Sequence, residues 1–358
     1  MSNIELLRIV AMLMIIGSHL AFHGVQHGLE TDAYIIWNNG PIENQVFVSF
    51  LRPGGNIGVA IFFLIAGYFG IERKKICLNK IVLESIFYGL IGACIGGVLL
   101  QSKTVKIDMI RTIARMLFNP SSGGTWWFLT VYILVVLLTP AIKEILLRKD
   151  KKAIKKMLFL VWVIEYVMGY MSENPYWRIQ QGVFYYFVGG YLKLFWEQGT
   201  HGNTKTKRSI LVCTLWSINA ILQFKTGKII ALGNKTLYQS LFTILAGTIS
   251  ETILTFGCAV ELFLIFKEMK IQSSTINCAA KTTFGIYLLH EIPFMRSILW
   301  NSIFRVDGSI WLTRWFVPYA FFCVFMVFFF CMFIDLARIK FFEARMIGLS
   351  RKIGSMIL

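Results

Sequence analysis

Long apolar blocks recur from one end of this 358-residue chain to the other. A helix needs about 20 apolar residues to cross the hydrocarbon core of a bilayer. Only 15% of the residues are charged, whereas soluble domains carry roughly 25%. The pattern therefore predicts an all-α, polytopic membrane protein with about ten spans. We expect these spans at residues 4–24, 48–71, 80–100, 126–147, 157–172, 181–197, 209–226, 240–267, 282–301 and 312–341.

The formal charge of +17 is distributed unevenly between the predicted loops. If the N-terminus is cytoplasmic, the inward loops carry 22 of the 36 Lys and Arg residues and the outward loops carry 10. Cytoplasmic loops of membrane proteins are enriched in these residues, so the counts predict that both termini are cytoplasmic. The basic excess is thus read as a topology signal and not as a sign of a nucleic-acid partner. A smaller share could bind anionic lipid or an anionic cofactor.

The loops between the predicted spans are too short to fold independently, so residues 1–358 are interpreted as a single transmembrane domain. We see no internal repeat of the kind that many transporters carry. The segment 105–118 has the periodicity of an amphipathic helix on the outer membrane surface. The seven cysteines contain no CxxC pair, which predicts neither a disulfide framework nor a zinc site built from cysteines.

Ionisable residues mark one face of the first predicted span. After 11 residues, His19 returns to within about 20° of Arg8 on a helix, and Glu5 lies one turn before Arg8. Ionisable groups inside a membrane are costly and usually face a cavity or a partner. The stripe therefore predicts a cation near the cytoplasm and an imidazole deeper in the membrane. It remains open that Arg8 reaches lipid phosphate and His19 lies near the outer interface.

His23 and His27 continue from His19 at a spacing of four residues. Histidines at this spacing can share a metal ion, but we find no third ligand at a suitable position in the sequence. We interpret both as solvated residues at the membrane interface and expect no metal.

Residues 54–68 are rich in glycine and alanine, which allows close helix packing and could also leave room for a ligand tunnel. The basic cluster Arg73, Lys74 and Lys75 follows at the predicted cytoplasmic side. Such a cluster suits a cofactor with several phosphates, although membrane topology alone would also produce it.

Aromatic and polar residues mark two further spans. Trp127 and Tyr132 stand at the outer end of the fourth span, where they could anchor the helix in the interface or stack on a sugar. The ninth span carries Tyr287 and His290 close to Pro293, which should interrupt the helix. Irregular backbone at membrane depth is tolerated where it lines a cavity, so we favour a functional role for this region, including Glu291. Glu165 and Glu251 are further acids within predicted spans.

Taken in order, these segments resemble the acyltransferase-3 family of bacterial membrane O-acyltransferases. The pieces that carry the resemblance are Glu5-x-x-Arg8-x-x-Ala11 followed by His19, the block from Gly58 to Tyr68, Trp127-Phe-Leu-x-x-Tyr132, Phe187-Val-Gly189, and Tyr287-Leu-Leu-His290. Two departures concern Ala66, where the family usually has serine, and Arg73-Lys74-Lys75-Ile76, where it often has Arg-x-x-Arg.

The resemblance implies a multi-pass enzyme of the bacterial cytoplasmic membrane. Such an enzyme moves an acetyl group from cytoplasmic acetyl-CoA to a hydroxyl of an envelope or exopolysaccharide sugar, free or lipid-linked. His19 would be the general base or a transient acetyl carrier, and Arg8 and Arg73 would hold the CoA phosphates. The expected roles are catalytic for His19, Glu5 and His290, cofactor-binding for Arg8, Arg73, Lys74 and Lys75, and acceptor-binding for Trp127, Tyr132, Tyr287 and Glu165.

A multi-pass transporter or flippase for a glycolipid or small anion is the alternative, because it could use the same charged residues as a relay. The acceptor sugar, the position of its hydroxyl, acyl chains other than acetyl, and the oligomeric state stay open.

Overall fold

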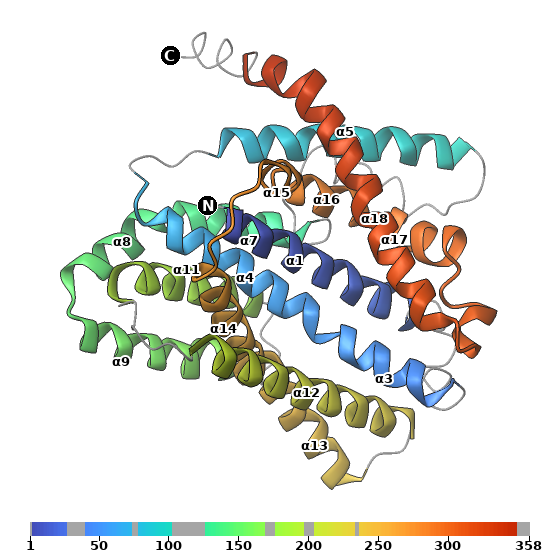
Figure 1. The fold of residues 1–358 in the computed structure, drawn as a ribbon, viewed down its shortest axis with the longest axis horizontal. Helices are drawn as coiled ribbons and strands as arrows, with labels where there is room; N and C mark the ends of the chain where they lie inside the picture. Colours follow the sequence, from blue (N-terminus) through green and yellow to red (C-terminus); the bar gives the residue numbers. More distant parts are fainter. Residues whose placement is uncertain are drawn as a thin grey trace.

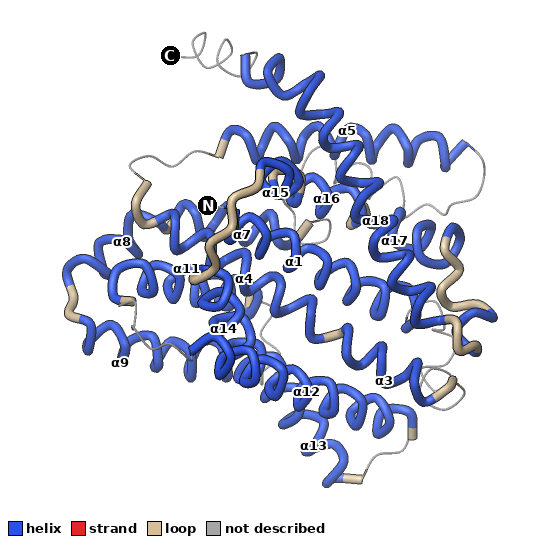
Figure 2. Tube along the Cα trace, in the orientation of Figure 1, coloured by secondary structure: helices blue, strands red, loops and turns tan. Residues whose placement is uncertain are grey.

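The computed structural model describes residues 2–26, 40–73, 78–101, 126–168, 176–196, 204–232 and 236–348. Within these ranges the regular structure is helical and there is no strand (Figure 2), as the apolar pattern predicts. The predicted surface helix at 105–118 and the basic residues Lys74 and Lys75 lie outside the described residues.

The helices follow one another with short connections. In the first half they are α1 (Ser2–His19), η1 (Leu20–Gln26), α3 (Ile42–Leu51), α4 (Pro53–Gly70), α5 (Asn79–Gln101), α7 (Trp127–Leu137), α8 (Thr139–Arg148), α9 (Lys151–Val161) and η2 (Trp162–Val167). In the second half they are α11 (Trp177–Phe195), α12 (Thr204–Ala231), α13 (Leu237–Thr248), η3 (Ile249–Leu254), α14 (Thr255–Lys267), α15 (Ser274–Ala280), α16 (Thr283–His290), α17 (Pro293–Ser297), η4 (Ile298–Ile303), η5 (Ser309–Leu312), α18 (Phe316–Arg338) and η6 (Ile339–Glu343).

Six described helical stretches are long and apolar enough to cross a membrane, and α7 with α8, bent by 49° at their junction, would make a seventh. These seven coincide with the predicted spans that begin at residues 4, 48, 80, 126, 209, 240 and 312. The other predicted spans, 157–172, 181–197 and 282–301, fall on shorter or more polar helices. The chain is therefore a multi-pass helical membrane protein, while the number ten and the side of the termini stay predictions.

The centre of the molecule is the pair α1 and α4, which run side by side (Figure 1). Helix α4 also packs against α11 and α14, and α5 and α18 lie on the opposite side of the pair from α9 and α12 (Figure 1). Helix α11 contains Arg178, Gln181 and Lys193, which lower its hydropathy, yet most of its residues are buried. Polar residues of a buried helix face protein and not lipid, which explains why a hydropathy criterion misses it.

Glycines set the spacing between α4 and α11. A Cβ atom added to Gly67 would overlap the backbone carbonyl of Tyr186, and one added to Gly189 would overlap that of Leu64. Each helix therefore presents a glycine to the backbone of the other. The packing role predicted for the glycine-rich block is confirmed here.

The helix break predicted at Pro293 is also present. Helix α16 ends at His290, Ile292 adopts an extended ψ of 121°, and Pro293 opens α17. Proline is compatible with the first position of a helix, where no partner for a backbone N–H is needed. The break leaves His290 and Glu291 at a helix end that faces α1 and η1.

Candidate active site

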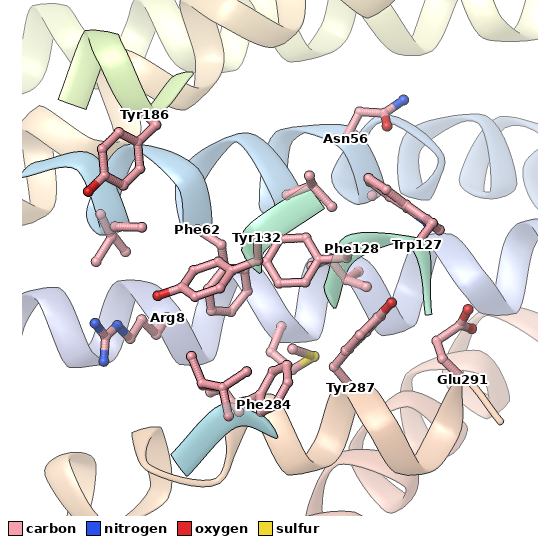
Figure 3. A pocket seen from close by; sticks show the side chains of 18 of the residues that line it. Arg8, Asn56, Phe62, Trp127, Phe128, Tyr132, Tyr186, Phe284, Tyr287 and Glu291 are labelled. Atoms are coloured by element: carbon pink, nitrogen blue, oxygen red, sulfur yellow. The ribbon is translucent and has the colours of Figure 1, made fainter. Parts of the chain in front are cut away.

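A cavity of about 1010 Å³ lies between helices that are far apart in the sequence (Figure 3). Its walls come mainly from α1, α4, α7 and α16, with further residues from α5, α8, α11 and η3. Six of the predicted site residues line it: Arg8, His19, Arg73, Trp127, Tyr132 and Tyr287.

The other predicted site residues lie elsewhere or outside the described side chains. Glu5 forms an ion pair with Arg8, with an N–O distance of 3.2 Å, so it orients that cation. His290 is buried directly behind His19 and does not line the cavity. The backbone of Glu165 belongs to η2, and its side chain is not described.

The cavity has a basic region contributed by several segments. Arg8 lies at one end of the view in Figure 3, and Arg73, Lys80, Lys143 and Lys281 also line the cavity. The last four all come from loops whose Lys and Arg content predicts a cytoplasmic side. Sequence reasoning missed Lys80, Lys143 and Lys281 because a count of loop charges cannot tell which of them turn inward. A polyphosphate would be held by cations arranged in this way.

The tautomers of two histidines follow from one carbonyl group. Nδ1 of His290 lies 2.6 Å from the backbone oxygen of Ile286. That oxygen can only accept, so Nδ1 carries the proton and Nε2 of His290 is an acceptor. Since this Nε2 lies 3.0 Å from Nδ1 of His19, the latter donates. Neutral His19 therefore keeps its lone pair on Nε2, the nitrogen that is able to take a proton.

A carboxylate stands beside the same histidine. Oε1 of Glu291 lies 3.0 Å from Nδ1 of His19, and Oε2 lies 2.7 Å from a guanidinium nitrogen of Arg296. The Glu291 side chain is only 4% exposed. A buried carboxylate at this distance stabilises the positive charge that His19 would acquire on taking a proton. The arrangement thus resembles the base and its orienting partner in acyl-transfer enzymes.

Aromatic side chains form the middle of the cavity. The Phe128 ring lies 5.5 Å from the Tyr287 ring, 5.9 Å from the Tyr132 ring and 6.1 Å from the Phe62 ring, measured between centroids. In Figure 3 these rings lie between Arg8 on one side and Trp127 and Glu291 on the other. A thin, reactive acyl group between two polar regions would be shielded from water by such a collar.

A polar wall near Trp127 was largely missed by the sequence analysis. The Arg178 guanidinium packs over the rings of Trp177 and Trp127, at 3.9 and 4.6 Å from their centroids. It also donates to the side-chain oxygen of Asn56 at 2.7 Å. Asn56 in turn donates to the carboxylate of Glu251. These residues come from four segments, and only the Trp177–Arg178 pair beside an apolar block could have drawn attention to them.

The comparisons with known proteins agree with this reading. A family model described as an acyltransferase domain matches residues 1–336. No curated protein and no solved structure matches the chain. Because the match extends over nearly the whole chain, the protein belongs to the acyltransferase-3 family, a family of membrane acyltransferases.

Proposed function

We propose that this member of the acyltransferase-3 family is an O-acetyltransferase that moves an acetyl group from cytoplasmic acetyl-CoA to a hydroxyl of an envelope sugar. One observation carries the proposal. A single cavity joins a basic region, suited to a polyphosphate donor, to a histidine whose lone pair is fixed on Nε2. A cation cluster alone would suit many anions, and a histidine alone many reactions.

The donor is proposed to bind with its phosphates among Arg8, Arg73, Lys80, Lys143 and Lys281. Hydrogen bonds between such cations and phosphate oxygens are charge-assisted and stronger than neutral ones. Arg8 is oriented by Glu5 at 3.2 Å, and Lys80 by Glu343 at 3.0 Å. The pantetheine arm would then extend along Phe62, Phe128 and Tyr132, which bring the thioester toward His19. Lys74 and Lys75 are proposed as additional contacts at the entrance.

The chemical step is proposed to run through His19. Its Nε2 takes the proton of the acceptor hydroxyl while the hydroxyl oxygen attacks the thioester carbonyl carbon. The tetrahedral intermediate collapses, the carbon–sulfur bond breaks, and the imidazolium returns the proton to the leaving CoA thiolate. A positioned general base contributes roughly 10²–10⁴-fold to such a rate. His290 and Glu291 keep His19 in the required tautomer and stabilise its charged form.

The acceptor is proposed to bind beside Trp127. An indole face and a set of fixed hydrogen-bonding groups suit a sugar, which has an apolar ring face and several hydroxyls. Asn56, Arg178 and Glu251 supply such groups in a connected network. The network is close to the base because Gly55, next to Asn56, packs against Ser18, next to His19. Tyr287, between Trp127 and Glu291 in Figure 3, would contact the same sugar.

The test uses protein purified in detergent or nanodiscs, acetyl-labelled acetyl-CoA and a glycan extract from a bacterial envelope. CoA release together with label in the glycan fraction supports the proposal. Uptake or flipping of a lipid-linked sugar without any consumption of acetyl-CoA would favour the transporter alternative instead. His23→Ala serves as a matched control for His19→Ala, since both remove an imidazole from the same end of the first span.

A further inference from the structure

One buried oxygen of the site has no hydrogen-bond donor among the described residues. It is Oε1 of Glu291, whose residue is 3% exposed. The other oxygen of this carboxylate is held by Arg296 at 2.7 Å. A buried charged oxygen without a donor is costly, so its surroundings indicate what it could bind.

Two imidazole nitrogens surround this oxygen. Nδ1 of His19 lies 3.0 Å from Oε1, and Nε2 of His23 lies 3.8 Å from it. The ligand atoms of His19, His23 and Glu291 all lie within 4.8 Å of one another. Nitrogen and oxygen ligands about 2.0–2.2 Å from a zinc ion must lie a few ångströms from each other, so the three atoms need only small shifts to share one.

We propose that His19, His23 and Glu291 form a binding site for a divalent transition-metal ion of the zinc type. Two imidazoles and one carboxylate are zinc ligands, whereas magnesium and calcium prefer oxygen donors. All three residues border the cavity, so a water molecule can take the fourth position. Arg296 remains on Oε2 and holds the carboxylate in place, as outer partners of metal ligands commonly do.

The sequence could not supply the third ligand. His19 and His23 are neighbours on one helical segment, but Glu291 stands at the far end of the chain and reaches them only because α16 stops before Pro293. The expectation of no metal was based on residues close in the sequence. The break in the ninth predicted span brings in the carboxylate that the helical spacing alone does not provide.

Metal binding would switch off the proposed base. Coordination through Nδ1 of His19 displaces the proton from that nitrogen, and in neutral His19 the proton then sits on Nε2. The lone pair that would take the acceptor proton is lost, so zinc is expected to inhibit acetyl transfer. This consequence rests on the proposed function, but the binding of zinc itself does not.

The test measures zinc binding directly on the purified full chain, after treatment with a chelator. Isothermal titration with zinc, and the visible absorption of bound cobalt(II), should reveal one site per chain. In His23→Ala the affinity should fall by at least roughly tenfold, because even the loss of an outer partner of a metal ligand costs 10–100-fold. His23 has no part in the proposed chemistry, so this variant should keep its transfer activity and lose its inhibition by zinc.

The exposed thiols of Cys94, Cys213 and Cys278 are the obvious competing zinc ligands. The triple serine variant is therefore the control and should bind zinc as the unmodified protein does. The absence of any zinc or cobalt site in the unmodified protein would overturn the inference, as would equal affinity in a monodisperse His23→Ala protein. If zinc binds through His23 but no acetyl transfer is found with or without metal, the metal site stands and the proposed function fails.

Discussion

Nδ1 of His19 lies 3.0 Å from Nε2 of His290, a residue 271 positions later in the chain. The second nitrogen of His290 is committed to the carbonyl of Ile286, so the direction of the hydrogen bond between the two histidines is fixed. One backbone oxygen of α16 therefore determines which nitrogen of His19 is basic.

The first prediction concerns His290 as a positioning residue. In His290→Ala, nothing holds the proton on Nδ1 of His19, and kcat should fall by roughly 10²-fold or more, since tautomer control is worth up to about 10⁴ in acyl-transfer triads. The KM for acetyl-CoA should not change. His290→Gln can present an oxygen to the same nitrogen and should recover part of kcat. Steady-state kinetics of both variants decide this, and equal activity of His290→Ala and the unmodified enzyme would contradict it.

The second prediction concerns the basic region of the cavity. Lys143→Ala should raise the KM for acetyl-CoA by roughly tenfold, because a hydrogen bond to a charged group contributes about 1.5–3 kcal/mol. Its kcat should be little changed. Lys149→Ala is the control, because Lys149 follows the same helix α8 but does not line the cavity. Binding of CoA by titration at two salt concentrations measures both variants. An equal loss in the two would mean that general charge, and not this site, binds the donor.

The third prediction concerns the polar wall beside Trp127. Arg178→Lys keeps the charge but removes the planar group that packs on two tryptophans and reaches Asn56, so the KM for the acceptor should rise several-fold. The affinity for CoA should be unaffected.

A matched control for this change is Arg208→Lys. Arg208 also packs near a tryptophan, with its guanidinium 5.2 Å from the Trp196 ring, and pairs with Glu261. It does not line the cavity, so the acceptor KM should stay the same. A normal acceptor KM in Arg178→Lys would remove this wall from the acceptor site.

The fourth prediction concerns the contact of α4 with α11. Gly67→Ala places a methyl group on the carbonyl of Tyr186 and should lower the free energy of unfolding by about 1–3 kcal/mol, the usual cost of overpacking. Gly97→Ala is the control, since a Cβ there meets no atom within 4 Å. Thermal unfolding in detergent should show a lower Tm for the first variant and an unchanged or higher Tm for the second.

Much of the helical architecture could be predicted from the sequence, because length and hydropathy are properties of single segments. The apolar blocks give seven of the predicted spans, and Pro293 gives the position of the break, since its ring and missing N–H act locally. Helix α11 shows the limit of this reasoning. Its polar residues are satisfied inside the protein, so its hydropathy does not indicate its burial.

The candidate site was only partly predictable for a related reason. His19 and Arg8 belong to one helix, and their common face follows from helical geometry. The contacts of His19 with Glu291, and of Arg178 with Asn56, join helices that are distant in the sequence. No periodicity records such contacts, and without an alignment only the folded chain reveals them.

The most direct test of the central claim follows single-turnover CoA release from bound acetyl-CoA by His19→Ala in the presence of a glycan acceptor. Binding of acetyl-CoA should be the same as in the unmodified protein, while transfer should slow by at least about 10²-fold, the lower range for a positioned general base. His23→Ala, measured in parallel without zinc, should react normally. Transfer by a folded His19→Ala protein at the unmodified rate would contradict the account.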